Sequence, residues 1–121
     1  MFFFIVTAHH ATGHGDAATP FLITKYFESA VEAVDQAKDL GYEFRGMDHG
    51  ISISHMEAER SYSKNDFKSQ DGRPVPVDFP NILFFRKAQD GFRVEYHVSL
   101  LARLDLQLPA KWLERAMPIP E

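Results

Sequence analysis

Residues 27–41 constrain the fold more than any other part of the chain, because their local signals agree on a single structure. Ser29 and Glu32 have the spacing of a capping box, in which each side chain accepts a hydrogen bond from a backbone N–H group of the first helical turn. Gly41 stands where a residue with positive φ commonly closes a helix. The sequence therefore predicts a well-capped helix that begins at about Ala30 and ends at Gly41.

This helix is predicted to be amphipathic. Apolar residues recur at intervals of three and four, which forms a stripe along one side, while polar residues fall on the other side. The apolar stripe consists of Val31, Val34, Ala37 and Leu40, and the polar face consists of Glu32, Asp35, Gln36 and Asp39. We expect the stripe to be buried against a sheet and the polar face to lie in water.

The segments on either side of the helix, 21–27 and 42–53, are rich in the β-branched and aromatic residues that favour strands. A crossover of this length allows the two strands to lie parallel in one sheet. At 51–54 the alternation Ile-Ser-Ile-Ser predicts isoleucines in the core and serines in water. The residues between the first strand and this unit, 9–20, are small and polar and predict an exposed loop.

Three further strands are predicted at 2–7, 81–87 and 92–101. The first is apolar at every position before Thr7, which is typical of a central strand buried on both faces. The other two flank a hairpin turn at 88–91 that contains a glycine. In the last strand, alternate residues from Phe92 onward are expected to share one face.

A short C-terminal helix is predicted at 109–117, where a proline suits the first turn and apolar residues follow at helical spacing. We expect it to dock through Trp112. The chain has 121 residues and is 45% hydrophobic, which suits one core. The expected fold class is α+β, a single domain over 1–121 with a mixed sheet of about four to six strands, the capped helix on one face and the short C-terminal helix.

Composition excludes several classes of function. The net charge of −4 argues against nucleic acid as a partner, because binding to phosphates requires a basic surface. The chain has no cysteine, which excludes disulfides, a thiol nucleophile and thiolate metal ligands. No apolar run is long enough to span a membrane, and the opening apolar run lacks the basic flank of a signal peptide. We therefore expect a soluble cytoplasmic protein.

The stretch 57–80 is polar, contains three prolines and shows little periodicity, which predicts a long excursion from the sheet. Its aromatic and cationic residues Tyr62, Phe67 and Arg73 are predicted to be exposed binding anchors. Phenylalanine pairs at 3–4 and 84–85 place rings on both sheet faces and predict an uncovered aromatic surface.

The leading hypothesis for function is a small acidic binding or interaction protein of the inhibitor, adaptor or phage and mobile-element accessory type. It would act through the exposed loop and the aromatic surface on a protein partner, with self-association into a homo-oligomer as a further expectation. Catalysis is the second choice, because no catalytic set in the sequence is complete, and no cofactor is expected unless a metal binds. Two alternatives are built on histidines.

The first alternative is a divalent metal site, such as zinc, formed by His9, His10, His14 and Asp16. Imidazole nitrogens and a carboxylate are suitable zinc ligands, and a loop could fold several of them around one ion. However, adjacent histidines on a strand point to opposite faces, so His9 and His10 can both be ligands only where the strand has ended.

The second alternative pairs His10 and Thr12 with His97 and Ser99 as two His-x-Thr/Ser dyads, expected on neighbouring strands. These dyads resemble the signature of the 2H phosphoesterases. The resemblance implies that the two histidines act as general base and general acid on a phosphodiester while the hydroxyls hold its oxygens. The apolar residues around His97 fit that pattern, whereas His9 stands where an apolar residue is usual.

Overall fold

The structure, a computed structural model, describes residues 2–12, 15–39, 50–57, 80–88 and 91–120, with side chains at 2–9, 22–36, 50–57, 80–86 and 92–120. Its elements are β1 (Phe2–Thr12), β2 (Gly15–Thr24), α1 (Phe27–Asp39), β3 (Gly50–Glu57), β4 (Asn81–Ala88), β5 (Gly91–Tyr96), α2 (Val98–Arg103), the 3₁₀ helix η2 (Ala110–Arg115) and β6 (Ala116–Pro118). None of the helices in these ranges is long and apolar enough to cross a membrane.

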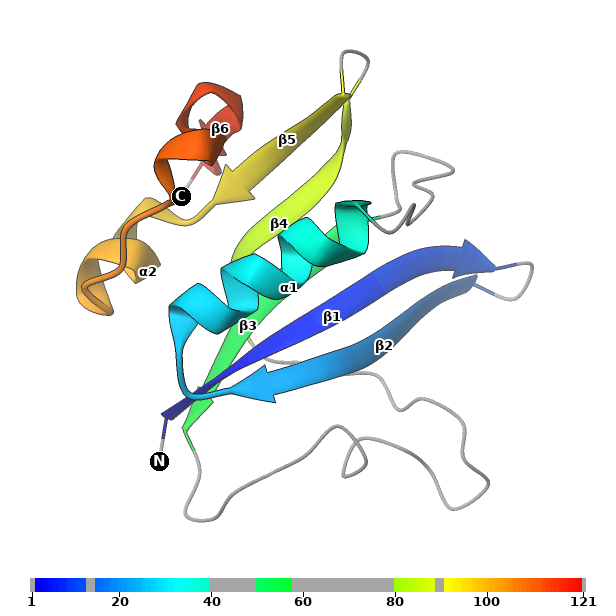
Figure 1. Cartoon of the computed structure of the whole chain (residues 1–121), viewed down its shortest axis with the longest axis horizontal. Helices are drawn as coiled ribbons and strands as arrows, with labels where there is room; N and C mark the ends of the chain where they lie inside the picture. Colours follow the sequence, from blue (N-terminus) through cyan, green and yellow to red (C-terminus); the bar gives the residue numbers. More distant parts are fainter. Residues whose placement is uncertain (1, 13–14, 40–49, 58–79, 89–90, 121) are drawn as a thin grey trace.

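The described strands form one mixed six-stranded sheet in the order β2-β1-β3-β4-β5-β6 (Figure 1). Neighbouring strands are antiparallel from β2 to β5, and β6 is parallel to β5. Because β1 is antiparallel to both β2 and β3, these two strands run parallel with β1 between them, and α1 is their crossover. The predicted α+β fold and the parallel strand, helix, strand unit are confirmed.

The first strand is central, as predicted, and its residues from Phe3 to Ala8 are buried. It continues to Thr12, however, and pairs with β2 from Gly15 onward, so the exposed loop predicted at 9–20 is wrong over its described residues. Pairing gives the backbone N–H and C=O groups of these small residues partners that an open loop would lack. Pro20 lies beside a register shift in the edge strand β2, where a missing N–H is tolerated.

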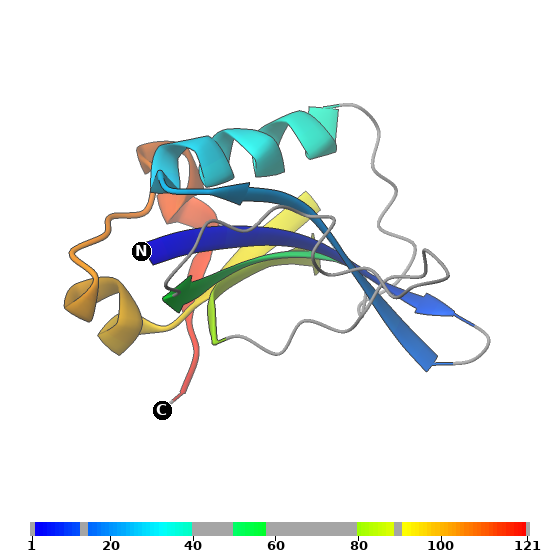
Figure 2. The same cartoon turned by 90° about the horizontal axis from the view of Figure 1, so that it is seen from below.

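Helix α1 lies across one face of the sheet, as Figure 2 shows, and its apolar stripe forms the core with the strands beneath it. The buried cluster consists of Phe4, Val6, Phe27, Ala30, Val31, Val34, Ile51, Ile53, Ile82, Leu83, Phe85, Val94, Leu101 and Trp112. The prediction of a buried helix face is confirmed for Val31 and Val34. The side chains of Ala37 and Leu40 lie outside the described part.

The helix begins earlier than predicted. The Tyr26 carbonyl accepts the first helical hydrogen bond, from Ala30 N at 3.3 Å, and Tyr26 N donates to Thr24 Oγ1 at 3.2 Å. Ser29 therefore lies inside the first turn, and its assignment as the helix cap is wrong. The ring of Phe27 packs on Phe4, with the centroids 5.5 Å apart. This tertiary contact favours a helix that already begins at Phe27, before the capping signal at Ser29. Gly41 lies outside the described residues.

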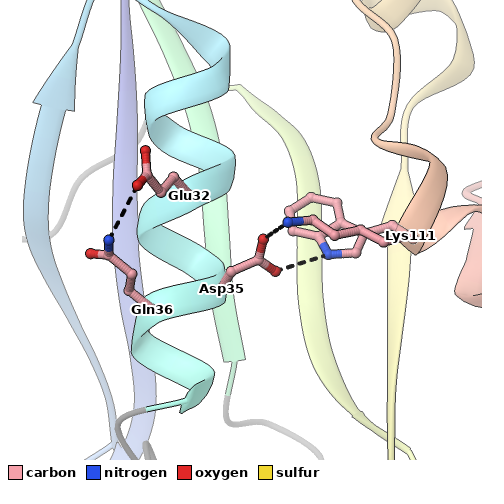
Figure 3. A network of polar contacts seen from close by, with 5 residues as sticks. Glu32, Asp35, Gln36 and Lys111 are labelled. Atoms are coloured by element: carbon pink, nitrogen blue, oxygen red, sulfur yellow. Dashed lines mark hydrogen bonds and ion pairs between the residues drawn. The ribbon is translucent and has the colours of Figure 1, made fainter.

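Helix η2 confirms the predicted C-terminal helix, docked by a tryptophan that is only 1% exposed. Asp35, predicted to lie in water, instead binds η2: its carboxylate forms an ion pair with Lys111 and accepts a hydrogen bond from Trp112 Nε1 at 3.3 Å (Figure 3). Leu113 is 59% exposed, because a 3₁₀ helix has three residues per turn and turns it away from the core.

The strand predicted at 92–101 ends at Tyr96, and α2 follows it. His97 keeps an extended backbone and donates its N–H to the Ile82 carbonyl, and its own carbonyl then accepts from Leu101 N. An apolar run of this length fits a strand or a helix equally well by periodicity. Burial of Leu101 in the core favours the helix, so the expectation of a strand through 101 is wrong.

Strand β3 is buried on both faces, so the prediction that its serines lie in water is also wrong. Ser52 is 1% exposed and lies with its Oγ 2.7 Å from His9 Nε2. Ser54 donates to Asn81 Oδ1 at 2.6 Å. Each buried hydroxyl thus has a hydrogen-bond partner, which removes most of the penalty for leaving water.

Gly50, the first residue of β3, has no room for a side chain. A Cβ atom there would overlap the Phe84 ring and press on the Phe85 carbonyl oxygen. We expect Gly50→Ala to cost about 1–3 kcal/mol of unfolding free energy, measured by urea denaturation. Phe84→Ala should reduce the cost of the glycine change, since it removes the ring. Equal costs in both backgrounds would contradict the overlap with the ring.

Candidate functional site

A cleft of about 500 Å³ opens at the end of the sheet where β1 begins and β3 ends. Figure 2 shows that the first residues of β1 and helix α2 lie at this same end. The lining combines aromatic, aliphatic and charged side chains: Phe2, His55, Met56, Glu57, Pro80, Arg103 and Leu104. The cleft is thus built from four chain segments that are far apart in sequence.

Backbone hydrogen bonds hold these segments together. His55 N donates to the Pro80 carbonyl at 3.2 Å, which joins the end of β3 to the start of β4. On the other side, α2 closes through Asp105, which has a φ of 54°. Aspartate is one of the few residues that adopt this left-handed conformation readily. The turn places Arg103 and Leu104 in the cleft wall.

One wall of the cleft is continuous with the core. The His55 ring stacks on Phe2, with centroids 5.5 Å apart and planes inclined by 19°. Phe2 in turn meets Phe4 edge-on at 5.1 Å, and Phe4 packs on Phe27 of α1. Such ring contacts add to the stability gained from burial alone. The aromatic surface of the cleft is therefore fixed in place before any ligand arrives.

The cleft lining contains three ionisable side chains, His55, Arg103 and Glu57. Burial, and secondarily the nearby Arg103 guanidinium, lower the pKa of His55 below its usual value, so this imidazole is neutral. Its Nε2 atom is buried and has no hydrogen-bond partner. The other two side chains, Arg103 and Glu57, carry opposite charges. Among the described residues, neither lies within ion-pairing distance of an opposite charge. The cleft thus offers one cation and one anion above an aromatic surface.

A second polar cluster lies on the sheet face that α1 leaves uncovered. His9 contacts Ser52 and packs on the Phe84 ring at 5.0 Å, and the Arg86 guanidinium lies 4.4 Å from the centroid of that ring. Arg86 and Arg93 both contact the Glu95 carboxylate, at 2.5 and 3.5 Å. A serine paired with a histidine can act as a nucleophile. Ser52 is too deeply buried for a substrate to reach it, so the cluster is structural.

Three of the proposed metal ligands, His9, His10 and Asp16, lie on the paired strands β1 and β2. His9 is in contact with Ser52, and the backbones of His10 and Asp16 pair with Ala17 and Ala11. His14 and the side chains of His10 and Asp16 are outside the described part. Among the side chains that are described, no three His, Asp or Glu residues are grouped to hold a metal. The zinc hypothesis stays a prediction from sequence.

The two His-x-Thr/Ser dyads are not on neighbouring strands. Strands β3 and β4 lie between β1, which carries His10 and Thr12, and β5, which His97 follows directly. Three strand spacings alone separate them by about 14 Å. Ser99 is part of the helix. The expected adjacency is wrong, and the backbone does not bring these histidines to one phosphate.

The predicted binding anchors Tyr62, Phe67 and Arg73 all lie outside the described residues. The uncovered aromatic surface expected at 3–4 and 84–85 is not found: Phe3, Phe4 and Phe85 are buried and Phe84 is half-buried. Large apolar side chains that are exposed in the described part of the chain are Tyr26, Val98, Leu113 and Met117.

No motif in the sequence marked the cleft residues, because they belong to four segments that meet only in the folded chain. Phe2 appeared to be one more core residue of the first strand, and Arg103 fell after the predicted strand in a segment without a motif. The nearest signal was the alternation at 51–54, which leads directly to His55 at the end of an apolar strand. Comparisons of the chain with protein-family models, with curated proteins and with solved structures found no match.

Proposed function

We propose that this protein is a small cytoplasmic binding protein that holds a compact organic molecule in the cleft between β1, β3 and α2. The observation that supports this most directly is the stacked pair of Phe2 and His55 in the wall of an open cleft. Ligand sites typically combine a mostly apolar lining with a few polar groups that fix orientation. Here the polar groups are Glu57 and Arg103.

Binding is favoured over catalysis by the state of the titratable groups. The Ser52 and His9 pair is closed to substrate, and the described lining residues of the cleft include no serine, threonine or tyrosine hydroxyl; their one carboxylate, Glu57, has no second carboxylate beside it to act as its acid or base partner. His55 is neutral and stacked, which suits an apolar platform. The protein partner predicted from Tyr62, Phe67 and Arg73 remains a separate proposal, which deletion of residues 61–71 would test. Self-association, which was predicted from the aromatic surface, is a separate proposal as well.

The proposal is tested with benzyl alcohol, a neutral aromatic probe, by heteronuclear NMR. We expect millimolar benzyl alcohol to shift the backbone amides of His55, Glu57 and Leu104, because the ring should stack beside Phe2. Phe2→Ala should weaken the effect, while Leu113→Ala, a change at an exposed apolar residue outside the cleft, should not. Shifts scattered over the surface, or equal responses in the two variants, would overturn the proposal.

A further inference from the structure

The two charged side chains of the cleft come from different elements and do not neutralise each other. Glu57 ends β3 and Arg103 ends α2. Both line the cleft, yet no ion pair joins them, and none joins either to another described residue. Each is therefore available to an opposite charge on a ligand.

The balance of charge distinguishes between classes of ligand. A simple anion would be attracted by Arg103 but repelled by Glu57. A simple cation would be attracted by Glu57 but repelled by Arg103. A molecule that carries both charges satisfies both side chains at once. Arg103 presents a planar fork of donors that matches a carboxylate, and Glu57 accepts hydrogen bonds from an ammonium group.

The aromatic and aliphatic side chains of the cleft favour a particular kind of uncharged group on the ligand. Phe2 and His55 form a flat stacked face, and Met56 and Leu104 add flexible and branched apolar surface around it. An aromatic ring placed on such a face gains stacking as well as burial. Since His55 is neutral at neutral pH, it does not add a third charge to be matched.

We propose that the ligand is a small zwitterion with an aromatic side group, the chemistry of a free aromatic amino acid. Its carboxylate pairs with Arg103, its ammonium group with Glu57, and its ring stacks beside Phe2 and His55. This inference rests on the proposed function, since it names the ligand class of the same cleft.

Four probes that share a phenyl ring separate the contributions of charge. L-Phenylalanine carries both charges, phenylacetate the negative one, 2-phenylethylamine the positive one, and benzyl alcohol none. Dissociation constants come from NMR titrations of the amides that line the cleft. We expect phenylalanine to bind about five-fold tighter than either singly charged probe, the effect of one partly exposed ion pair.

Two variants assign each charge to its partner. Arg103→Met should weaken phenylalanine about five-fold and leave 2-phenylethylamine no weaker, whereas Glu57→Gln should weaken phenylalanine equally and leave phenylacetate no weaker. Arg115→Met and Glu114→Gln, matched changes on η2 and outside the cleft lining, should alter none of the four constants. Thermal melts of all four variants establish that each is folded.

The outcomes separate this inference from the proposed function. If benzyl alcohol binds in the cleft but phenylalanine binds no tighter, the zwitterion is wrong and the binding function stands. If phenylacetate binds as tightly as phenylalanine, the ligand is a simple anion and the zwitterion is likewise wrong. If none of the four probes shifts the cleft amides, both proposals fail.

Discussion

Replacing Val34 by aspartate is expected to remove a large part of the protein's free energy of unfolding. Val34 is 0% exposed and lies in the middle of the apolar face of α1. A carboxylate there would lose its water without gaining a partner, and such buried charges cost more than about 4 kcal/mol. That loss is a large part of the 5–15 kcal/mol, roughly, that stabilises a domain of this kind. Far-ultraviolet circular dichroism and urea denaturation measure the effect.

Two milder variants show what each part of the helix contributes. Val34→Ala removes two methyl groups and should cost about 2 kcal/mol, so the difference from aspartate isolates the charge. Ser29→Ala should change stability by less than about 0.5 kcal/mol, since Ser29 lies within the first turn and alanine is the better helix former. If Ser29→Ala instead lost about 1 kcal/mol of unfolding free energy, the result would indicate that Ser29 caps the helix after all.

The sequence predicted well those features that depend on local pattern. The apolar run from Phe2, the amphipathic face at Val31 and Val34, and the hairpin between β4 and β5 each follow from periodicity and turn residues. Their order along the chain then allowed few arrangements, because a crossover helix between strands of one sheet favours parallel strands. The α+β fold was accessible from those rules.

Failures arose where tertiary contacts overrode a local preference. The polar residues from His9 onward were paired into a hairpin, and the serines of β3 were buried because His9 and Asn81 supplied hydrogen bonds. The residues after Tyr96 were predicted to continue the strand, but they form α2, because the periodicity of this run fits a strand and a helix equally well. The cleft could not be predicted, since it depends on how α2 returns Arg103 to the end of the sheet.

Trp112→Ala is expected to cost about 3–5 kcal/mol, the largest effect of any change outside α1 and the central strands. The indole is almost fully buried between α1 and β5, packs at a tilt on Phe85 with ring centroids 5.8 Å apart, and is held by the contact of its N–H with Asp35. Truncation removes the main apolar anchor of η2, so β6 should also lose its pairing with β5. Urea denaturation gives the cost, and hydrogen exchange at Met117 and Ile119 reports the loss of the edge strand.

Two further variants divide this effect between packing and polar contact. Trp112→Phe keeps a ring in the core but leaves Asp35 without the indole donor, and should cost about 1–2 kcal/mol. Lys111→Met removes an ion pair whose lysine side chain is 58% exposed, and should cost less than about 1 kcal/mol. The expected order is therefore alanine, then phenylalanine, then the lysine variant. If Lys111→Met proved as harmful as Trp112→Ala, the C-terminal segment would be held to α1 by charge, and the buried indole would not be its anchor.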